Sequence, residues 1–168
     1  MKNLIIFSHT HFENSRVNKA LLKAAQDKAE VRNLEALYEK GKKEFDIKLE
    51  QDFLVKAEHI IFQFPLFWLN CPPLLKSYMD TIFLPDLLES RALVGKNFSL
   101  AISTGSPKQN YQKDGANGYT IEEITYNFRA MCLYIGFNFK GIFHSDGSFA
   151  MSDERLNDFC KAYQIFLD

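Results

Sequence analysis

The chain has 168 residues and a formal net charge of −1, from 20 lysines and arginines against 21 aspartates and glutamates. Apolar residues make up 46% and aromatic residues 14%, which excludes an intrinsically disordered chain because such chains have too little apolar surface to bury. The balanced charge argues against a nucleic-acid-binding protein, since these proteins present a basic face to the phosphates.

No stretch reaches the ~20 apolar residues of a membrane-spanning helix, and the apolar run Leu4–Phe7 is shorter than the ~7–15 residues of a signal-peptide core. The three cysteines are widely spaced and form no C-x-x-C pair, which indicates reduced thiols and a cytoplasmic protein. Neither these cysteines nor His9 and His11 complete a set of metal ligands, so we expect no metal site.

Short apolar runs alternate with longer amphipathic segments. Residues 3–7 are predicted as a strand buried on both faces, and a helix follows with Ser15 capping its start. A weak second strand is predicted at residues 31–37, then an exposed lysine-rich loop at 38–48 and a short helix around 53–57.

The centre of the chain repeats this alternation. Residues 59–64 form the second strong strand, which Pro65 closes because proline cannot donate to a sheet ladder. Pro72 and Pro73 open a helix, and residues 98–103 form the third strong strand.

The last third begins with a capping box, in which Thr120 and Glu123 start a helix that runs to about residue 134 and that Gly136 ends. Residues 137–143 are the last predicted strand. Ser152 begins the terminal helix, with acidic residues in its first turn where the helix dipole favours them.

This alternation predicts a single domain over residues 1–168 with an α/β fold, in which a doubly wound five-stranded parallel sheet carries helices on both faces. The flavodoxin-like strand order 2-1-3-4-5 fits, because it places the weak second strand at an edge. Ligands bind such sheets beyond the carboxyl ends of the strands, at the switch between the first and third strands. Three loops meet there, namely residues 8–18, 64–73 and 103–119.

The first loop leads into a helix, whose free N–H groups and positive dipole end form a seat for a phosphate. The Ser15 hydroxyl and the Arg16 charge add donors. The alternative is purely structural, with Ser15 acting only as a cap and His9 bonded only to backbone.

The second loop is strongly apolar for a connection, and its aromatic residues include Trp68. It is either a wall for a flat aromatic ligand or a surface packed against a neighbouring loop or a second subunit. Cys71 has no obvious base beside it, so we expect an inert thiol.

The third loop combines Gly105, which lets backbone approach a ligand closely, with hydroxyl and N–H donors at Thr104 and Ser106. Tyr111 supplies a further donor, although an ordinary polar turn would also explain the segment. A phosphate seat, an apolar slot and a row of donors together suit FMN. The donors would face the polar edge of the flavin ring, where negative charge develops on reduction.

Over nearly its whole length the sequence resembles the flavodoxin-like NAD(P)H:quinone oxidoreductases, which include small quinone reductases that act as ancillary subunits of potassium-efflux antiporters. The run Phe64-Pro65-Leu66-Phe67-Trp68 and the helix to Asp80 are similar to the family's F-P-L-x-W…P-x-x-L-K…D signature. The third loop, with Tyr111, is similar to the family's T-T-G-G…Y, and the first loop is similar to its phosphate loop.

The resemblance implies a homodimer whose flavin takes hydride from NADH or NADPH and passes it to a quinone in a ping-pong cycle. We expect FMN rather than FAD, because little chain follows the last strand to build an adenine pocket. The residues implied at the phosphate are His9, Ser15, Val17 and Asn18. Those implied at the ring are Pro65, Leu66, Phe67 and Trp68. Those implied at its polar edge are Thr104, Gly105 and Ser106, with Tyr111 stabilising the reduced flavin.

The sequence departs from the family at three places. Asn117 stands where the family has a catalytic histidine, and asparagine cannot carry a proton through the cycle. Ser106 replaces the second glycine, and residues 83–91 lack the family's lid. These departures leave open a regulatory module that docks on a transporter or another partner, with flavin structural or absent.

Two other interpretations share the strand order. A phosphorelay receiver needs acidic residues after the first strand to hold Mg²⁺, and this chain has Ser8 and His9 there. A small electron-carrier flavodoxin fits less well, because the charge is nearly neutral and the first loop contains a histidine and a phenylalanine.

Overall fold

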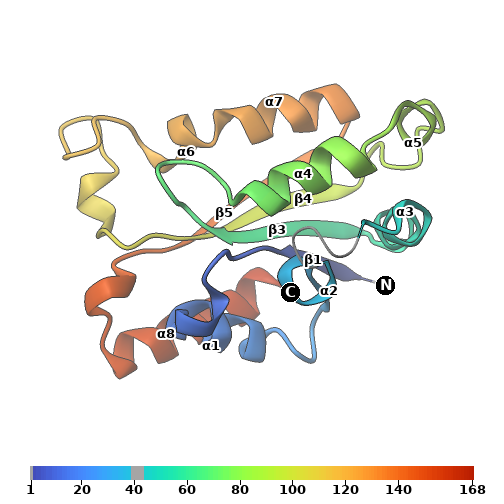
Figure 1. Cartoon of the computed structure of the whole chain (residues 1–168). Helices are drawn as coiled ribbons and strands as arrows, with labels where there is room; N and C mark the ends of the chain where they lie inside the picture. The colour runs from blue at the N-terminus through green and yellow to red at the C-terminus, as the bar shows by residue number, and fades with distance from the viewer. Residues whose placement is uncertain (1, 39–43) are drawn as a thin grey trace.

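The strands form one parallel sheet in the order β2-β1-β3-β4-β5, which confirms the predicted topology. This computed structural model describes residues 2–38 and 44–168 (Figure 1). The strands are β1 (Asn3–Phe7), β2 (Glu30–Asn33), β3 (His59–Pro65), β4 (Asn97–Ser103) and β5 (Asn138–Ser145). The three inner strands are almost entirely buried, which explains their continuous apolar runs.

Helices cover both faces of the sheet (Figure 1). They are α1 (Arg16–Ala24), α2 (Leu34–Leu37), α3 (Ile47–Lys56), α4 (Pro73–Ile82), α5 (Pro85–Glu89), α6 (Ile121–Ile124), α7 (Tyr126–Ile135) and α8 (Asp153–Phe166). Successive strand residues point to opposite faces, so Ile5 packs with α1 and α8 while Ile6 packs in the core beneath α4 and α7.

The predicted helix boundaries rest on side chains that cap them. Ser15 and Ser152 each accept a hydrogen bond from a backbone N–H of the first turn of their helix. Thr120 and Glu123 form the predicted capping box, and Gly136 ends α7 in the left-handed conformation with φ of 90°.

Two predictions near the edge strand are wrong. The second strand was predicted over residues 31–37 but ends at Asn33, because the Asn33 side chain accepts a hydrogen bond from Ala36 N–H and starts α2. The exposed loop predicted at 38–48 contains a buried Tyr38 and the beginning of α3, while residues 39–43 lie outside the described part. Tyr38 is buried because its hydroxyl donates to Glu50.

The helix predicted from Thr120 to about residue 134 is broken into α6 and α7. Thr125 lies at the break, and its hydroxyl donates to the Ile121 carbonyl at 2.7 Å. A threonine that bonds back into the preceding turn bends or ends a helix. The short helix α5 lies within residues 83–91, where no element was predicted, and begins with Pro85 at its first position.

The loops that follow β1, β3, β4 and β5 lie together at one end of the sheet, on the left in Figure 1. This end of the sheet therefore holds the loops in which the sequence predicts the site.

Within residues 2–38 and 44–168 no helix is long and apolar enough to cross a bilayer.

Candidate functional site

A cavity of about 260 Å³ lies at the carboxyl ends of the strands, where the three predicted loops meet. The predicted residues that line it are His9, Ser15, Val17, Asn18, Pro65, Leu66, Phe67 and Gly105. Its other lining residues are His11, Asn14, Arg16, Ser103, Ser148 and Phe149. The topology thus brings the first and second loops and the start of the third loop to one place.

The start of α1 is the part of the cavity that suits an anion. The first turn of α1 contains no acidic residue. Its free N–H groups and positive dipole end would therefore stabilise an anion bound at this position. The Arg16 guanidinium is already engaged, since it donates to the Met151 carbonyl at 2.7 Å and pairs with Asp153 at the start of α8. The helix terminus and Ser15 therefore supply the donors, rather than the Arg16 charge.

His9 is a neutral side chain at the floor of the first loop. Its Nδ1 accepts a hydrogen bond from His11 N–H at 3.1 Å, so the ring proton resides on Nε2. Its ring meets the Phe67 ring edge-on, with the centroids 5.5 Å apart. Burial lowers the pKa of His9 from 6.5 to about 4, which keeps the ring an uncharged donor at neutral pH.

Buried neutral histidines are expected to make the fold less stable in mild acid. Because the pKa of His9 falls from 6.5 to about 4 on folding, the unfolded chain binds more protons between these pH values. Burial lowers the pKa of His59 and His144 as well. The contribution of neutral His9 to the free energy of unfolding is therefore fully present above pH 6.5 and is lost as the pH falls toward 4.

Urea unfolding at a series of pH values between 4 and 6.5 measures this loss. His9→Gln, which cannot titrate, is expected to show a flatter dependence than the wild type in the same window. An unchanged slope in His9→Gln would contradict the assignment of His9 as a buried neutral ring.

The second loop turns sharply after β3. Phe67 and Asn70 exchange backbone hydrogen bonds of 3.0 and 3.1 Å, and the two residues between them have positive φ angles, 49° for Trp68 and 61° for Leu69. Residues other than glycine rarely adopt this backbone conformation, so the turn is strained, and strained residues cluster at ligand sites. Trp68 is fully exposed at the tip and is not among the residues that line the cavity.

The third loop is held in place by the segment that follows β5. Backbone N–H groups of Thr104, Gly147 and Ser148 donate to the carbonyls of Ser145, Ser106 and Thr104, at 2.9 to 3.0 Å. The Thr104 hydroxyl donates to the Ser106 carbonyl and lies 2.9 Å from His144 Nε2. Since the Thr104 hydroxyl proton is donated to the Ser106 carbonyl, the Thr104 oxygen accepts the hydrogen bond from His144 Nε2–H. These bonds fix the backbone of Gly105, which lines the cavity, whereas Thr104 and Ser106 are not among its lining residues.

Asp146 ties the third loop to α8. Its carboxylate accepts hydrogen bonds from Lys108 N–H and from the Arg155 guanidinium, both at 2.7 Å. Burial alone would raise the pKa of Asp146, but the hydrogen bonds and the Arg155 charge outweigh it and hold that pKa below its ordinary value. The loop is therefore pinned from both sides.

Gly105 and Phe149 meet at the rim of the cavity. A Cβ atom added to Gly105 would lie 2.3 Å from the Phe149 ring, so no other residue fits here without moving that ring. Phe149 is nevertheless 92% exposed, and it therefore presents a free aromatic surface beside the cavity. Sequence reasoning missed Phe149, and the available signal was an aromatic residue within the polar turn of residues 147–150.

Tyr111 and Asn117 lie behind the rim rather than in the cavity wall. Tyr111 is buried, and its ring stands perpendicular to that of His144 with the centroids 5.5 Å apart. Asn117 is half-buried and donates its backbone N–H to the Asn110 carbonyl. Sequence reasoning also missed His144, which reaches this place from the end of β5.

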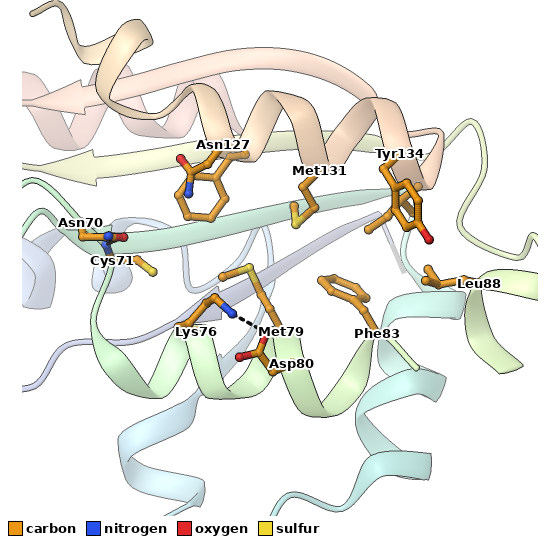
Figure 2. Close-up of a pocket in the computed structure, with 12 residues that line it drawn as sticks. Asn70, Cys71, Lys76, Met79, Asp80, Phe83, Leu88, Asn127, Met131 and Tyr134 are labelled. Atoms are coloured by element: carbon orange, nitrogen blue, oxygen red, sulfur yellow. Dashed lines mark hydrogen bonds and ion pairs between the residues drawn. The ribbon is translucent and has the colours of Figure 1, made fainter. Parts of the chain in front are cut away.

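A larger cavity of about 670 Å³ lies between α4 and α7 (Figure 2). Met79 and Phe83 face Met131 and Tyr134 across it, and its charged groups, Lys76 and Asp80, form an ion pair with each other. The charges of these two side chains are therefore paired with each other. We assign the ligand site to the smaller cavity and treat the larger one as an apolar groove.

Cys71 lies at the end of this groove nearest the second loop. Burial raises the pKa of its thiol above the ordinary value, which disfavours the reactive thiolate. This agrees with the expected inert thiol. Within the described residues, no group of three or more histidine, cysteine, aspartate or glutamate side chains is arranged to hold a metal ion.

Comparisons with known proteins agree with the flavodoxin-like fold. A family described by its flavodoxin-like fold matches residues 1–166. An uncharacterized NAD(P)H oxidoreductase of Bacillus subtilis is 33% identical over 97% of this chain and 84% of its own length. General stress protein 14 of Treponema denticola, solved in complex with FMN, is 30% identical with a TM-score of 0.92, covering 100% of this chain and 98% of that chain.

A third relative carries a more specific name. The solved structure of an NADPH-quinone reductase from P. pentosaceus is 26% identical with a TM-score of 0.90, covering 100% of this chain and 98% of that chain. Together these matches confirm the resemblance drawn from the sequence.

Proposed function

We propose that this chain, which belongs to the flavodoxin-like NAD(P)H:quinone oxidoreductase family, is a cytoplasmic FMN-dependent enzyme that reduces a quinone or a similar aromatic acceptor. The observation that carries the proposal is the cavity at the strand ends, where the start of α1, the apolar residues Leu66 and Phe67, and Gly105 converge. FMN, when bound, supplies a ring that accepts hydride from NADH or NADPH and passes it to the acceptor in a ping-pong cycle.

The residues that line the cavity suit the phosphate and the ring of FMN. Ser15 and the N-terminus of α1 suit the phosphate, because both offer donors and no acidic residue lies in that turn. Leu66 and Phe67 form the apolar wall for the ring. Gly105 lines the cavity and has no side chain, which would let a ligand approach its backbone closely.

The chain's own part in the chemistry is electrostatic. Thr104, held by His144, fixes the Gly105 and Ser106 backbone, whose N–H groups would stabilise negative charge at the polar edge of the ring. The hydroxyl of Tyr111 would add one donor behind this edge. Asn117 has no titratable group, so it would hydrogen-bond rather than relay a proton. Trp68 would cover the ring from the strained turn.

The visible spectrum of the purified protein, followed by titration of the apo form with FMN and FAD, tests the cofactor. We expect flavin absorption and tighter binding of FMN. Steady-state oxidation of NADH and NADPH with a benzoquinone tests the reaction, and parallel double-reciprocal lines are expected for ping-pong turnover. A flavin-loaded protein without turnover on any acceptor would contradict the proposed activity.

The groove between α4 and α7 supports a homodimer as part of the proposal (Figure 2). Leu133 and Tyr134 on α7 are 81% and 82% exposed, which is unusual for large apolar side chains beside an apolar groove. The groove also continues into the second loop through Asn70 and Cys71. A second copy docked here would therefore bury apolar surface close to the ring wall.

Leu133→Glu is expected to convert the dimer into a monomer, halving the mass measured by light scattering after gel filtration. A charge buried at the interface without a partner disfavours association. Ile165→Glu is the matched control, because Ile165 is 73% exposed on α8, on the opposite face of the sheet. A Leu133→Glu protein with the wild-type mass would overturn the proposed interface.

A second candidate function follows from Asn117 and from the short segment after α4, where α5 takes the place of the family's lid. A protein without a proton relay and without a lid would serve as a regulatory module that docks on a transporter or another partner. The turnover assay separates the two, since such a module binds flavin weakly or without catalysis.

A further inference from the structure

A glutamine lies within the fully buried strand β3. Gln63 stands between Phe62 and Phe64 and has no exposed surface. Its neighbours across the sheet are Phe7 on β1 and Ala101 on β4. Burying an amide is unfavourable unless it is hydrogen-bonded, so the partners of Gln63 indicate why it is there.

Those partners form a continuous chain of hydrogen bonds from α8 to the cavity. The Tyr163 hydroxyl donates to Gln63 Oε1 at 2.8 Å, and Gln63 Nε2 donates to Asn18 Oδ1 at 3.4 Å. Asn18 Nδ2 then donates to Ser103 Oγ at 2.9 Å and to Ser15 Oγ at 3.1 Å. Gln63 and Tyr163 are 0% exposed, and Asn18 is 2% exposed, so water does not compete for these bonds.

The first donor sets the direction of every later bond. Burial raises the pKa of Tyr163 and keeps its proton in place, so the phenol donates to the oxygen end of Gln63. The amide nitrogen of Gln63 then faces Asn18, which accepts the hydrogen bond with its side-chain oxygen. The amide nitrogen of Asn18 is thereby turned toward the two serines.

This direction decides what the cavity offers a ligand. Ser15 Oγ accepts from Asn18 Nδ2 and also from Asn18 N–H at 3.3 Å, so both of its acceptor positions are used. Its own hydrogen is then left to donate, and Ser15 lines the cavity. Ser103 also accepts from Asn18 and lines the same cavity.

We infer that Tyr163 and Gln63 are positioning residues that orient Asn18 so that Ser15 and Ser103 present hydroxyl donors to the cavity, which selects a ligand with a phosphate group over its neutral counterpart. This inference rests on the proposed FMN site and assigns its preference for a phosphate to residues outside the cavity. Donors facing a dianion form charge-assisted hydrogen bonds, which are stronger than those to a neutral hydroxyl.

The test compares FMN with riboflavin, which lacks the phosphate, by titrating each into the apo protein. Tyr163→Phe removes only the first donor, and we expect the preference for FMN over riboflavin to fall about tenfold, as for one lost hydrogen bond. Riboflavin affinity should stay at the wild-type value. A purely structural role for Tyr163 would weaken both ligands equally or neither.

Tyr78→Phe is the matched control. Tyr78 is equally buried and its hydroxyl donates to Glu50 at 3.3 Å, on the other face of the sheet. We expect it to keep the wild-type preference. Loss of the preference in both variants would contradict the inference, because it would show a general response to a missing buried hydroxyl.

Gln63→Met is the second variant, and it tests the inference even if Tyr163→Phe does not fold. Methionine keeps the length of the side chain and removes both hydrogen bonds. It should lower the FMN preference at least as much. Wild-type preference in a folded Tyr163→Phe or Gln63→Met protein overturns the inference while leaving the FMN site intact. A wild-type protein that binds FMN no more tightly than riboflavin overturns the phosphate seat and the inference together.

Discussion

Ser15→Asp is expected to weaken FMN binding by about 100-fold while riboflavin binding stays near the wild-type value. Aspartate caps a helix as well as serine does, so the start of α1 keeps its backbone. Two unit charges about 4 Å apart interact by about 4 kcal/mol near a protein surface, equivalent to about a thousandfold in affinity, and solvent screening reduces this figure. The new carboxylate would face the phosphate at that distance range and repel it.

Ser152→Asp is the matched control for this measurement. Ser152 caps α8 as Ser15 caps α1, with its side chain accepting from Arg155 N–H. Its FMN and riboflavin affinities should both equal those of the wild type. Equal losses for FMN and riboflavin in Ser15→Asp would instead mean that the substitution disturbs the fold, and an unchanged FMN affinity would place the phosphate elsewhere.

The parts of the fold that the sequence predicts are those specified by local physics. Residues 3–7 and 98–103 are continuous apolar runs because their strands are buried on both faces. Ser15 and Thr120 each cap a helix by accepting a hydrogen bond from a backbone N–H in its first turn. The position of the proposed site follows from strand order alone, because the ends of parallel strands meet at one edge.

The parts that the sequence does not predict depend on partners far away in the chain. The strand predicted over residues 31–37 ends early, because Asn33 caps residues 34–37 into a helix that leads to the buried cluster around Glu50. His144 at the end of β5 and Phe149 in the connection that follows lie outside the three loops at the switch point. Only the folded chain places them against Gly105 and Thr104.

Glu50→Ala is expected to lower the free energy of unfolding by about 3–5 kcal/mol, measured as a lower urea midpoint. Glu50 has no exposed surface, pairs with Arg32, and accepts hydrogen bonds from the hydroxyls of Tyr38 at 2.5 Å and Tyr78 at 3.3 Å. Removing the carboxylate leaves a largely buried guanidinium without its counter-charge, and this penalty exceeds that of the lost contacts.

Asp52→Ala is the control, because Asp52 is exposed on the same helix and should change stability little. Arg32, Tyr38, Glu50 and Tyr78 contribute nothing to the lining of the cavity at the strand ends. Folded Glu50→Ala protein should therefore bind FMN like the wild type, in contrast to Ser15→Asp, which should fold normally and bind FMN about 100-fold more weakly. A Glu50→Ala protein of wild-type stability would show that the guanidinium finds water or another partner. The two variants thus separate what holds the sheet together from what the end of the sheet binds.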